Sequence, residues 1–226
     1  MSSIYTEKWV LFLDILGFGD IINNKKKSEM LAEKILLVIN KATKIPSISK
    51  IPMCISQFSD TFIVTIDGIS SAAICVTACF LQFILLQSEL LSRGAITYGK
   101  VFHNGSQFIG PAINRAYNLE KSEAIYPRVI IDPECEEKFD LKDNFYIKKD
   151  FDGYWYIDLI RGAELTMDND NIPLNKMRDI LHSFFGQIDG LYEKHKNTKY
   201  RGKYTWLKNK ADEFHAEKTK HLNQKK

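Results

Sequence analysis

The sequence contains little cysteine, proline or glycine. Its 226 residues include four cysteines, six prolines and twelve glycines. So few cysteines argue against a disulfide framework, and so little proline and glycine excludes a collagen-like or low-complexity chain. The fractions of hydrophobic residues (45%) and charged residues (26%) are those of a soluble globular protein. We therefore expect a folded chain that needs neither disulfides nor a structural metal.

Several familiar catalytic patterns are also absent. The sequence contains no Walker motif, no G-x-G-x-x-G and no Ser-His-Asp arrangement, and its five histidines lack the spacing of a zinc site. Cys75 and Cys79 are four residues apart in an apolar run with no histidine nearby. We expect buried, reduced thiols at these positions.

Targeting and membrane segments are the third absence. The apolar run after Lys8 ends in Asp14 without a small-residue cleavage site, so it predicts no signal peptide, and a cytoplasmic protein is the expectation. Residues 68–88 carry no charge and are long enough to cross a membrane. Ser, Thr and Gln side chains dilute that run, so we interpret it as a central helix buried against a sheet.

Charge is distributed unevenly along the chain. The net charge is only +3, but residues 194–226 hold eleven Lys and Arg against three acids. A solvated helix is the favoured interpretation of this basic segment, and nucleic acid is not the expected partner. The competing hypothesis is nucleic-acid binding, with Tyr200, Tyr204 and Trp206 available for base stacking, which predicts steeply salt-dependent binding.

Hydrophobic periodicity and turn residues predict the order of elements. Strands are expected at 9–14, 53–58, 61–66, 94–103, 128–132, 145–149 and 154–160, and helices at 28–43, 70–91 and 110–125. This order indicates an α/β sandwich (α+β class) of the ferredoxin-like split βαβ type, which we assign to residues 1–165. A polar break at 168–171 falls at the start of a helical, basic C-terminal extension, residues 166–226. The extension is predicted to form two helices with a break near 198–202.

Two aspartates are candidates for metal binding. Asp14 ends a hydrophobic strand, Asp60 lies in the predicted hairpin turn, and a βαββ unit brings that strand beside the hairpin. Two carboxylates at one sheet edge suit Mg²⁺ or Mn²⁺, which bind through oxygen ligands and substrate phosphates. The backbone carbonyl of Ile15 could add a further ligand. Each aspartate taken alone is equally well explained as an ordinary strand-end or turn residue.

Four segments together resemble the catalytic domain of class III nucleotidyl cyclases, the adenylate and guanylate cyclase family. FLDILGFGD (12–20) resembles the F-x-D-I-x-G-F signature, and ISQFSDTFIVTI (55–66) resembles the second metal-binding hairpin. RGAITYGKVFHNG (93–105) resembles the Arg-x-Gly-x-x-x-G strand, and FIGPAINRAYNLEKSEA (108–124) resembles the G-x-x-V-N-x-A-x-R-L-E helix. These segments follow the family's order and spacing over more than half of the chain.

The resemblance implies a fold, a reaction and a site. In the family, two aspartates and a backbone carbonyl, here Asp14, Asp60 and Ile15, hold two divalent ions. These help the 3′-hydroxyl of a nucleoside triphosphate attack its α-phosphate and release pyrophosphate. The phosphates would lie over the backbone of Ile15, Leu16, Gly17 and Phe18. The resemblance also implies a homodimer with each site at the interface, where one subunit gives the metal ligands and the other gives helix residues.

The base-reading positions depart from the purine cyclases. A Lys and an Asp, or a Glu and a Cys, read the purine in those enzymes, and the corresponding residues here are Ser56 and Gln107. The hydrogen-bond pattern that selects adenine or guanine is therefore missing, which favours a different base. CTP and UTP both stay open, because each of the two side chains can donate and accept.

The family helix is also altered. Asn114 matches the asparagine that positions the ribose, but the transition-state arginine four residues later is replaced by Asn118. Arg115, about 100° further around the helix, and Lys148 on a late strand are the candidate replacements. The alternatives are a surface ion pair for Arg115 and a solvated Lys148.

Small stand-alone cyclases with these features resemble the pyrimidine cyclases of bacterial Pycsar antiphage defence. This resemblance implies a cytidylate or uridylate cyclase that makes cyclic CMP or cyclic UMP, and a separate effector that the product activates. Two further hypotheses stay open: a catalytically silent cyclase-like module that binds a nucleotide or a partner, and a purine cyclase with unusual base contacts.

Overall fold

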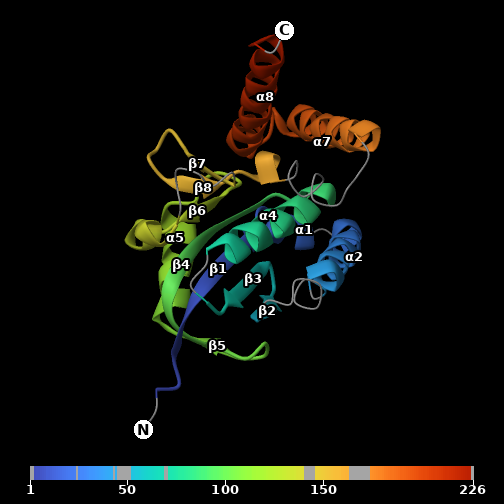
Figure 1. The fold of residues 1–226 in the computed structure, drawn as a ribbon. Coiled ribbons are helices and arrows are strands. Elements are labelled where there is room, and N and C mark those ends of the chain that lie inside the picture. Colours follow the sequence, from blue (N-terminus) through green and yellow to red (C-terminus); the bar gives the residue numbers. More distant parts are fainter. Residues whose placement is uncertain are drawn as a thin grey trace.

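The computed structural model describes residues 3–23, 25–42, 44, 52–68, 71–139, 146–162 and 174–224 (Figure 1). An eight-stranded sheet runs through it in the order β2-β3-β1-β4-β6-β8-β7, with the short β5 paired to β4. The strands are β1 (Thr6–Ile15), β2 (Met53–Phe58), β3 (Thr61–Ile66), β4 (Ser92–His103), β5 (Phe108–Ile109), β6 (Val129–Ile131), β7 (Ile147–Lys149) and β8 (Trp155–Ile157). The β4–β6 pair is parallel and the other described pairs are antiparallel.

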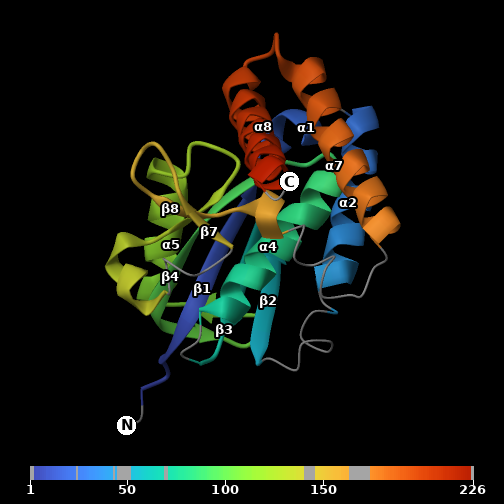
Figure 2. The same ribbon diagram turned by 45° about the horizontal axis from the view of Figure 1, so that its top comes forward.

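Helices cover both faces and one end of this sheet (Figures 1 and 2). They are α1 (Phe18–Ile22), α2 (Lys25–Ala42), α4 (Ala72–Gln87), α5 (Pro111–Ser122), the 3₁₀ helix η1 (Pro133–Lys138), α7 (Leu174–His195) and α8 (Arg201–Gln224). One core lies between β1, α2 and α4, and a smaller one lies between β1, β4 and α5 on the other face. The result is an α/β sandwich, as the order of elements predicts, and helices cover both faces of its sheet.

The β1–β4 pair at the centre of the sheet depends on a glycine. Leu13 lies opposite Gly94 in the antiparallel register. A Cβ atom added to Gly94 would lie 2.3 Å from the backbone oxygen of Phe12, which no side chain can tolerate. Gly94 therefore permits the close approach of the two strands.

The hairpin of β2 and β3 forms as predicted, with Ser59 and Asp60 between the strands. Ser59 adopts a φ of 55°, the left-handed conformation that tightens the turn. The uncharged segment forms helix α4, most of whose residues are buried. Within the described residues, no helix is both long and apolar enough to span a bilayer.

Two predicted elements were too long. The helix expected at 70–91 ends at Gln87, because Glu89 takes a φ of 60° and redirects the chain into β4. The strand expected at 154–160 ends at Ile157. There the Asp158 carboxylate accepts the N–H groups of Ile160 and Arg161 at 3.1 and 3.2 Å and starts a helical turn.

The remaining boundaries moved by a few residues, and some predictions lie outside the described residues. The latter are the polar break at 168–171 and residue 145, the first residue of the strand expected at 145–149. All four cysteines are free, and three of them are buried, as expected for reduced thiols.

The two C-terminal helices form an antiparallel pair against the end of the sheet (Figure 2). Apolar side chains of α7 and α8, including Phe184, Ile188, Trp206 and Leu207, share a core with the end of α4 and with β6 and β8. The chain reverses between them at residues 196–200, where the sequence predicts the break. The domain boundary at 165/166 stays a prediction.

Candidate functional site

Asp14 and Asp60 lie together where β1 meets the β2–β3 hairpin. Asp14 pairs with Thr61 in the β1–β3 register, and the N–H of Ile15 donates to the backbone oxygen of Asp60 at 2.9 Å. The hydrogen bond fixes the hairpin turn to the end of β1. The sequence-derived expectation that these two residues share a sheet edge therefore agrees with their positions.

Three further charged side chains surround Asp14. Arg93, opposite it on β4, places Nε 3.8 Å from the Asp14 carboxylate and 2.7 Å from that of Glu120 on α5. Glu120 is almost fully buried although it is an acid. Lys203 of α8 is the third charge, and it acts electrostatically on both Asp14 and Glu120.

Burial and neighbouring carboxylates raise the pKa of two acids in this cluster, Asp14 and Glu120. Burial, aided by the nearby Glu120 and Asp60, raises the pKa of Asp14 to about 7, and Arg93 and Lys203 only partly oppose this. Burial is also the main cause of the raised pKa of Glu120. Without a bound cation the cluster thus holds more negative charge than its two positive side chains neutralise.

This excess of negative charge fits a divalent cation. The available donors are carboxylate oxygens, which Mg²⁺ and Mn²⁺ prefer. Among the described residues, no group of three or more His, Cys, Asp or Glu side chains could hold a metal ion. The predicted site uses two aspartates and a backbone carbonyl. The residues present are compatible with the predicted metal ligands Asp14, Asp60 and Ile15, whose roles stay predictions.

The predicted phosphate loop, residues 15–18, follows directly. Gly17 adopts a φ of 78° between β1 and α1, a conformation that favours glycine. Ile15 and Leu16 already use their N–H groups, which donate to the backbone oxygens of Asp60 and Leu91 at 2.9 and 2.8 Å. Of the four predicted residues, only Gly17 and Phe18 therefore remain as backbone donors to a phosphate.

The predicted base-reading residue Ser56 belongs to a buried hydrogen-bonded chain. Its hydroxyl donates to the backbone oxygen of Gly105 at 2.7 Å, and its Oγ lies 2.7 Å from Nε2 of His103. Because the hydroxyl proton is used for Gly105, Nε2–H of His103 donates to Ser56, and Nδ1 accepts from Thr65 at 3.0 Å. Gln107 follows in the same loop, with its side chain exposed.

We expect His103 to make stability pH-dependent. Burial lowers its pKa from 6.5 to about 4. Between pH 6.5 and pH 4, His103 is therefore protonated in the unfolded chain and neutral in the folded chain. The stability is present above pH 6.5 and falls by at most about 3 kcal/mol as the pH drops to 4. His103→Gln keeps a donor for Ser56 and removes this titration. Urea unfolding of both proteins from pH 7.5 to 4.5 should show a shallower decline for the variant, and parallel declines would contradict the assignment.

Helix α5 carries the predicted residues and Glu120 on two different faces. Asn114 and Asn118, four residues apart, are exposed and line an open groove of about 580 Å³ together with Arg115. Glu120 lies on the buried face toward Asp14. Within one chain, Asp14 and Asp60 therefore lie together, whereas Asn114 and Asn118 face solvent on the opposite side of α5.

The two candidate replacement cations are both engaged elsewhere. Arg115 donates from Nε and Nη2 to the buried carboxylate of Asp132 at 3.0 and 2.8 Å and also contacts Glu134. Lys148 donates to Glu217 of α8 at 3.0 Å. Their suggested roles toward phosphate therefore stay untested predictions, and each now competes with an ion pair.

Sequence reasoning missed three charged residues around Asp14: Glu120, Arg93 and Lys203. Glu120 lies in the helix segment that carried the family resemblance, and Arg93 entered only as part of the Arg-x-Gly strand pattern. A charged residue at a predicted buried helix position was the available signal for Glu120. Lys203 had no specific signal, because eleven basic residues share its segment.

Solved structures share this fold. No family model and no curated protein matches the sequence. The guanylyl cyclase domain of the RhoGC fusion protein from the aquatic fungus Blastocladiella emersonii aligns at a TM-score of 0.54 and 14% identity over 68% of this chain and 95% of that one. The guanylate cyclase domain of RhGC from Catenaria anguillulae, solved in complex with GTP, aligns at 0.52 and 12% over 68% and 97%.

A light-regulated adenylyl cyclase from a bacterium aligns at a TM-score of 0.52 and 16% identity over 69% of this chain and 52% of that one. These identities establish the fold alone. The chain has the class III nucleotidyl cyclase fold, which confirms the fold class predicted from the four sequence segments.

Proposed function

We propose that the chain is a nucleotide cyclase that converts CTP or UTP to cyclic CMP or cyclic UMP and pyrophosphate. The observation that carries the proposal is the pairing of Asp14 with Asp60 beside the buried Glu120, in a cyclase fold. A domain with a purely structural role has no need of three neighbouring acids, two of which raise the pKa of the third, Asp14.

Each residue of the site has a distinct role in the proposed reaction. Asp14, Asp60 and the carbonyl of Ile15 would hold two Mg²⁺ or Mn²⁺ ions, which supply charge neutralisation at the attacking and leaving oxygens. Arg93 balances Glu120 and orients it toward Asp14. In a homodimer, the exposed Asn114 and Asn118 of a second copy would reach the ribose and phosphates. Exposed Ile109 and Tyr117 next to them supply apolar surface for such an interface.

The pyrimidine assignment rests on the Ser56 and Gln107 positions. Ser56 carries no charge, and its hydroxyl proton is committed to Gly105, so it offers the base an acceptor. A side chain of this kind provides neither the lysine nor the acid that reads a purine. A purine cyclase with other base contacts is the second candidate, because the neighbours of this fold include guanylyl and adenylyl cyclases.

The biological setting follows from the resemblance to Pycsar cyclases. The product would act as a second messenger in bacterial antiphage defence and would activate a separate effector. Cells that carry this chain with its cognate effector should resist phage, and Asp60→Ala should remove that resistance.

A product assay tests the reaction and the base. Purified protein is given ATP, GTP, CTP or UTP with Mn²⁺, and products are identified by mass spectrometry. We expect a cyclic pyrimidine monophosphate that is absent with Asp60→Ala. A cyclic purine would overturn the base assignment and keep the cyclase, and no product from any nucleotide would favour a silent nucleotide-binding module.

A further inference from the structure

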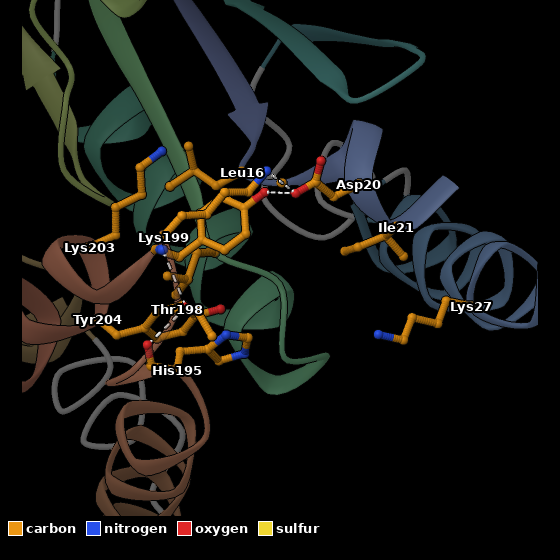
Figure 3. A pocket seen from close by; sticks show the side chains of 12 residues that line it. Leu16, Asp20, Ile21, Lys27, His195, Thr198, Lys199, Lys203 and Tyr204 are labelled. Atoms are coloured by element: carbon orange, nitrogen blue, oxygen red, sulfur yellow. Dashed lines mark hydrogen bonds and ion pairs between the residues drawn. The ribbon is translucent and has the colours of Figure 1, made fainter. Parts of the chain in front are cut away.

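A cavity of about 320 Å³ separates the predicted phosphate loop from the C-terminal helix pair (Figure 3). One wall of the cavity is formed by Leu16, Gly17 and Asp20. The other wall is formed by Thr198 and Lys199 of the reversal between α7 and α8 and by Lys203 of α8. Its volume lies within the range of about 300–1,000 Å³ that is typical of small-molecule sites. The C-terminal extension thus completes a site that the sheet alone leaves half open.

Three lysines line this cavity, and Lys203 is the one whose ammonium group is left for a ligand. Lys27 has another interaction, and Lys199 is exposed and paired with Asp20. Lys203 is half-buried, and its ammonium group makes no hydrogen bond or ion pair with the described residues; it acts on Asp14 and Glu120 at longer range. In Figure 3 its ammonium group points to the strand end above Leu16. A half-buried ammonium without a close partner is costly unless an anion compensates it.

The extension is anchored on both sides of the cavity, so the position of Lys203 is fixed. Tyr200 donates its hydroxyl to Asp20 beside the loop. Further along α8, the indole of Trp206 donates to the buried Asp150 at 2.9 Å. On α7, the Gln187 amide donates to the backbone oxygen of Leu86 at 2.8 Å.

We propose that Lys203 binds the polyphosphate of the nucleotide and provides, from the C-terminal extension, a cation that helix α5 lacks at Asn118. This inference rests on the proposed function for the identity of the ligand. A lysine ammonium offers three donors as a compact charge, which suits phosphate oxygens bridging to a metal held by Asp14 and Asp60. Its place in the cavity beside Leu16 and Gly17 of the predicted phosphate loop assigns it to the phosphates.

Binding of inorganic tripolyphosphate tests the inference without a base or ribose. Isothermal titration in excess Mg²⁺ compares the full chain with three variants. Lys203→Met keeps the aliphatic stem and removes the charge, and Lys203→Arg keeps the charge. Lys196→Ala removes a lysine outside the cavity that, among the described residues, forms an ion pair with Glu193 alone. Thermal melts verify that each variant is folded.

We expect Lys203→Met to raise the Kd about tenfold or more, because charge-assisted hydrogen bonds are lost. Lys203→Arg should stay within about threefold, and Lys196→Ala should bind like the wild type. Unchanged or tighter binding by Lys203→Met would overturn the inference, and tighter binding would identify the extension as an obstructing cover. An equal loss with Lys196→Ala, or no binding by the wild type, would also overturn it.

The two proposals fail separately. Lys203-dependent tripolyphosphate binding with no product from any nucleotide would remove the cyclase and leave the phosphate site. Cyclic product made by Lys203→Met with the wild-type Kd would remove the role of Lys203 and leave the cyclase.

Discussion

Replacing Asp14 with asparagine is expected to reduce the proposed cyclase turnover by at least about a thousandfold, because the proposed two-metal catalysis depends on this carboxylate. The same change should raise the melting temperature of the metal-free protein. Asp14 has its pKa raised to about 7 by burial, Glu120 and Asp60, so its charge is unfavourable in the metal-free protein and a neutral amide removes it. Activity and stability should therefore move in opposite directions.

Measurement requires three readouts on one preparation: product formation, the melting temperature without metal, and the shift of that temperature on adding Mn²⁺. Asp67→Asn is the matched control, since Asp67 is exposed and its carboxylate pairs with Lys8 alone among the described residues. The wild type and Asp67→Asn should be stabilised by Mn²⁺, and Asp14→Asn should not. An Asp14→Asn protein that melts lower without metal, or that keeps full turnover, would contradict the assignment.

The second large effect concerns Asp150, which connects helix α8 to the sheet. Its fully buried carboxylate accepts from Arg128, from Lys210 at 3.0 Å and from Trp206 at 2.9 Å. Asp150→Ala leaves the buried guanidinium of Arg128 with one partner, Asp152, and removes both bonds to α8. We expect a loss of about 3–5 kcal/mol in the free energy of unfolding, the cost of breaking a buried pair.

Asp152→Ala is the control, because Asp152 pairs with the same arginine from a position that is 29% exposed. It should cost about 1 kcal/mol or less. Urea unfolding followed by circular dichroism measures both. Equal losses in the two variants would contradict this prediction, because they would show that the burial of Asp150 under α8 adds nothing to the free energy of unfolding.

Much of the fold could be predicted because its signals are local. Ser59 and Asp60 stand between two alternating runs, which define a hairpin within a few residues. The segment 154–160 failed because its apolar run suits a strand or a helix equally. The decision lies with the Asp158 carboxylate, which accepts two N–H groups beyond it and starts a helical turn. Such a cap is visible only once the backbone is known.

The candidate site divides in the same way. Asp14 and Asp60 belong to short motifs, so their residue types and order were sufficient to find them. Lys203 is brought to Asp14 by the packing of α7 and α8 through Phe184 and Trp206, apolar contacts that do not specify which lysine of the helix faces the loop. Arg115 was uncertain from sequence, because the acid that pairs with it, Asp132, lies on a different element.

The central position of β1 has a consequence for how the chain is made. β1 pairs with β3 on one edge and with β4 on the other, so Trp9 lies between Ile66 and Tyr98. Both neighbours are synthesised later, at a delay of roughly 5–20 s for about 90 residues at ribosomal speed. During that time an apolar strand has two unpaired edges, the condition under which nascent chains associate. We therefore expect chaperones to bind β1 during synthesis. Slowing translation between residues 16 and 98 should lower the yield of soluble protein.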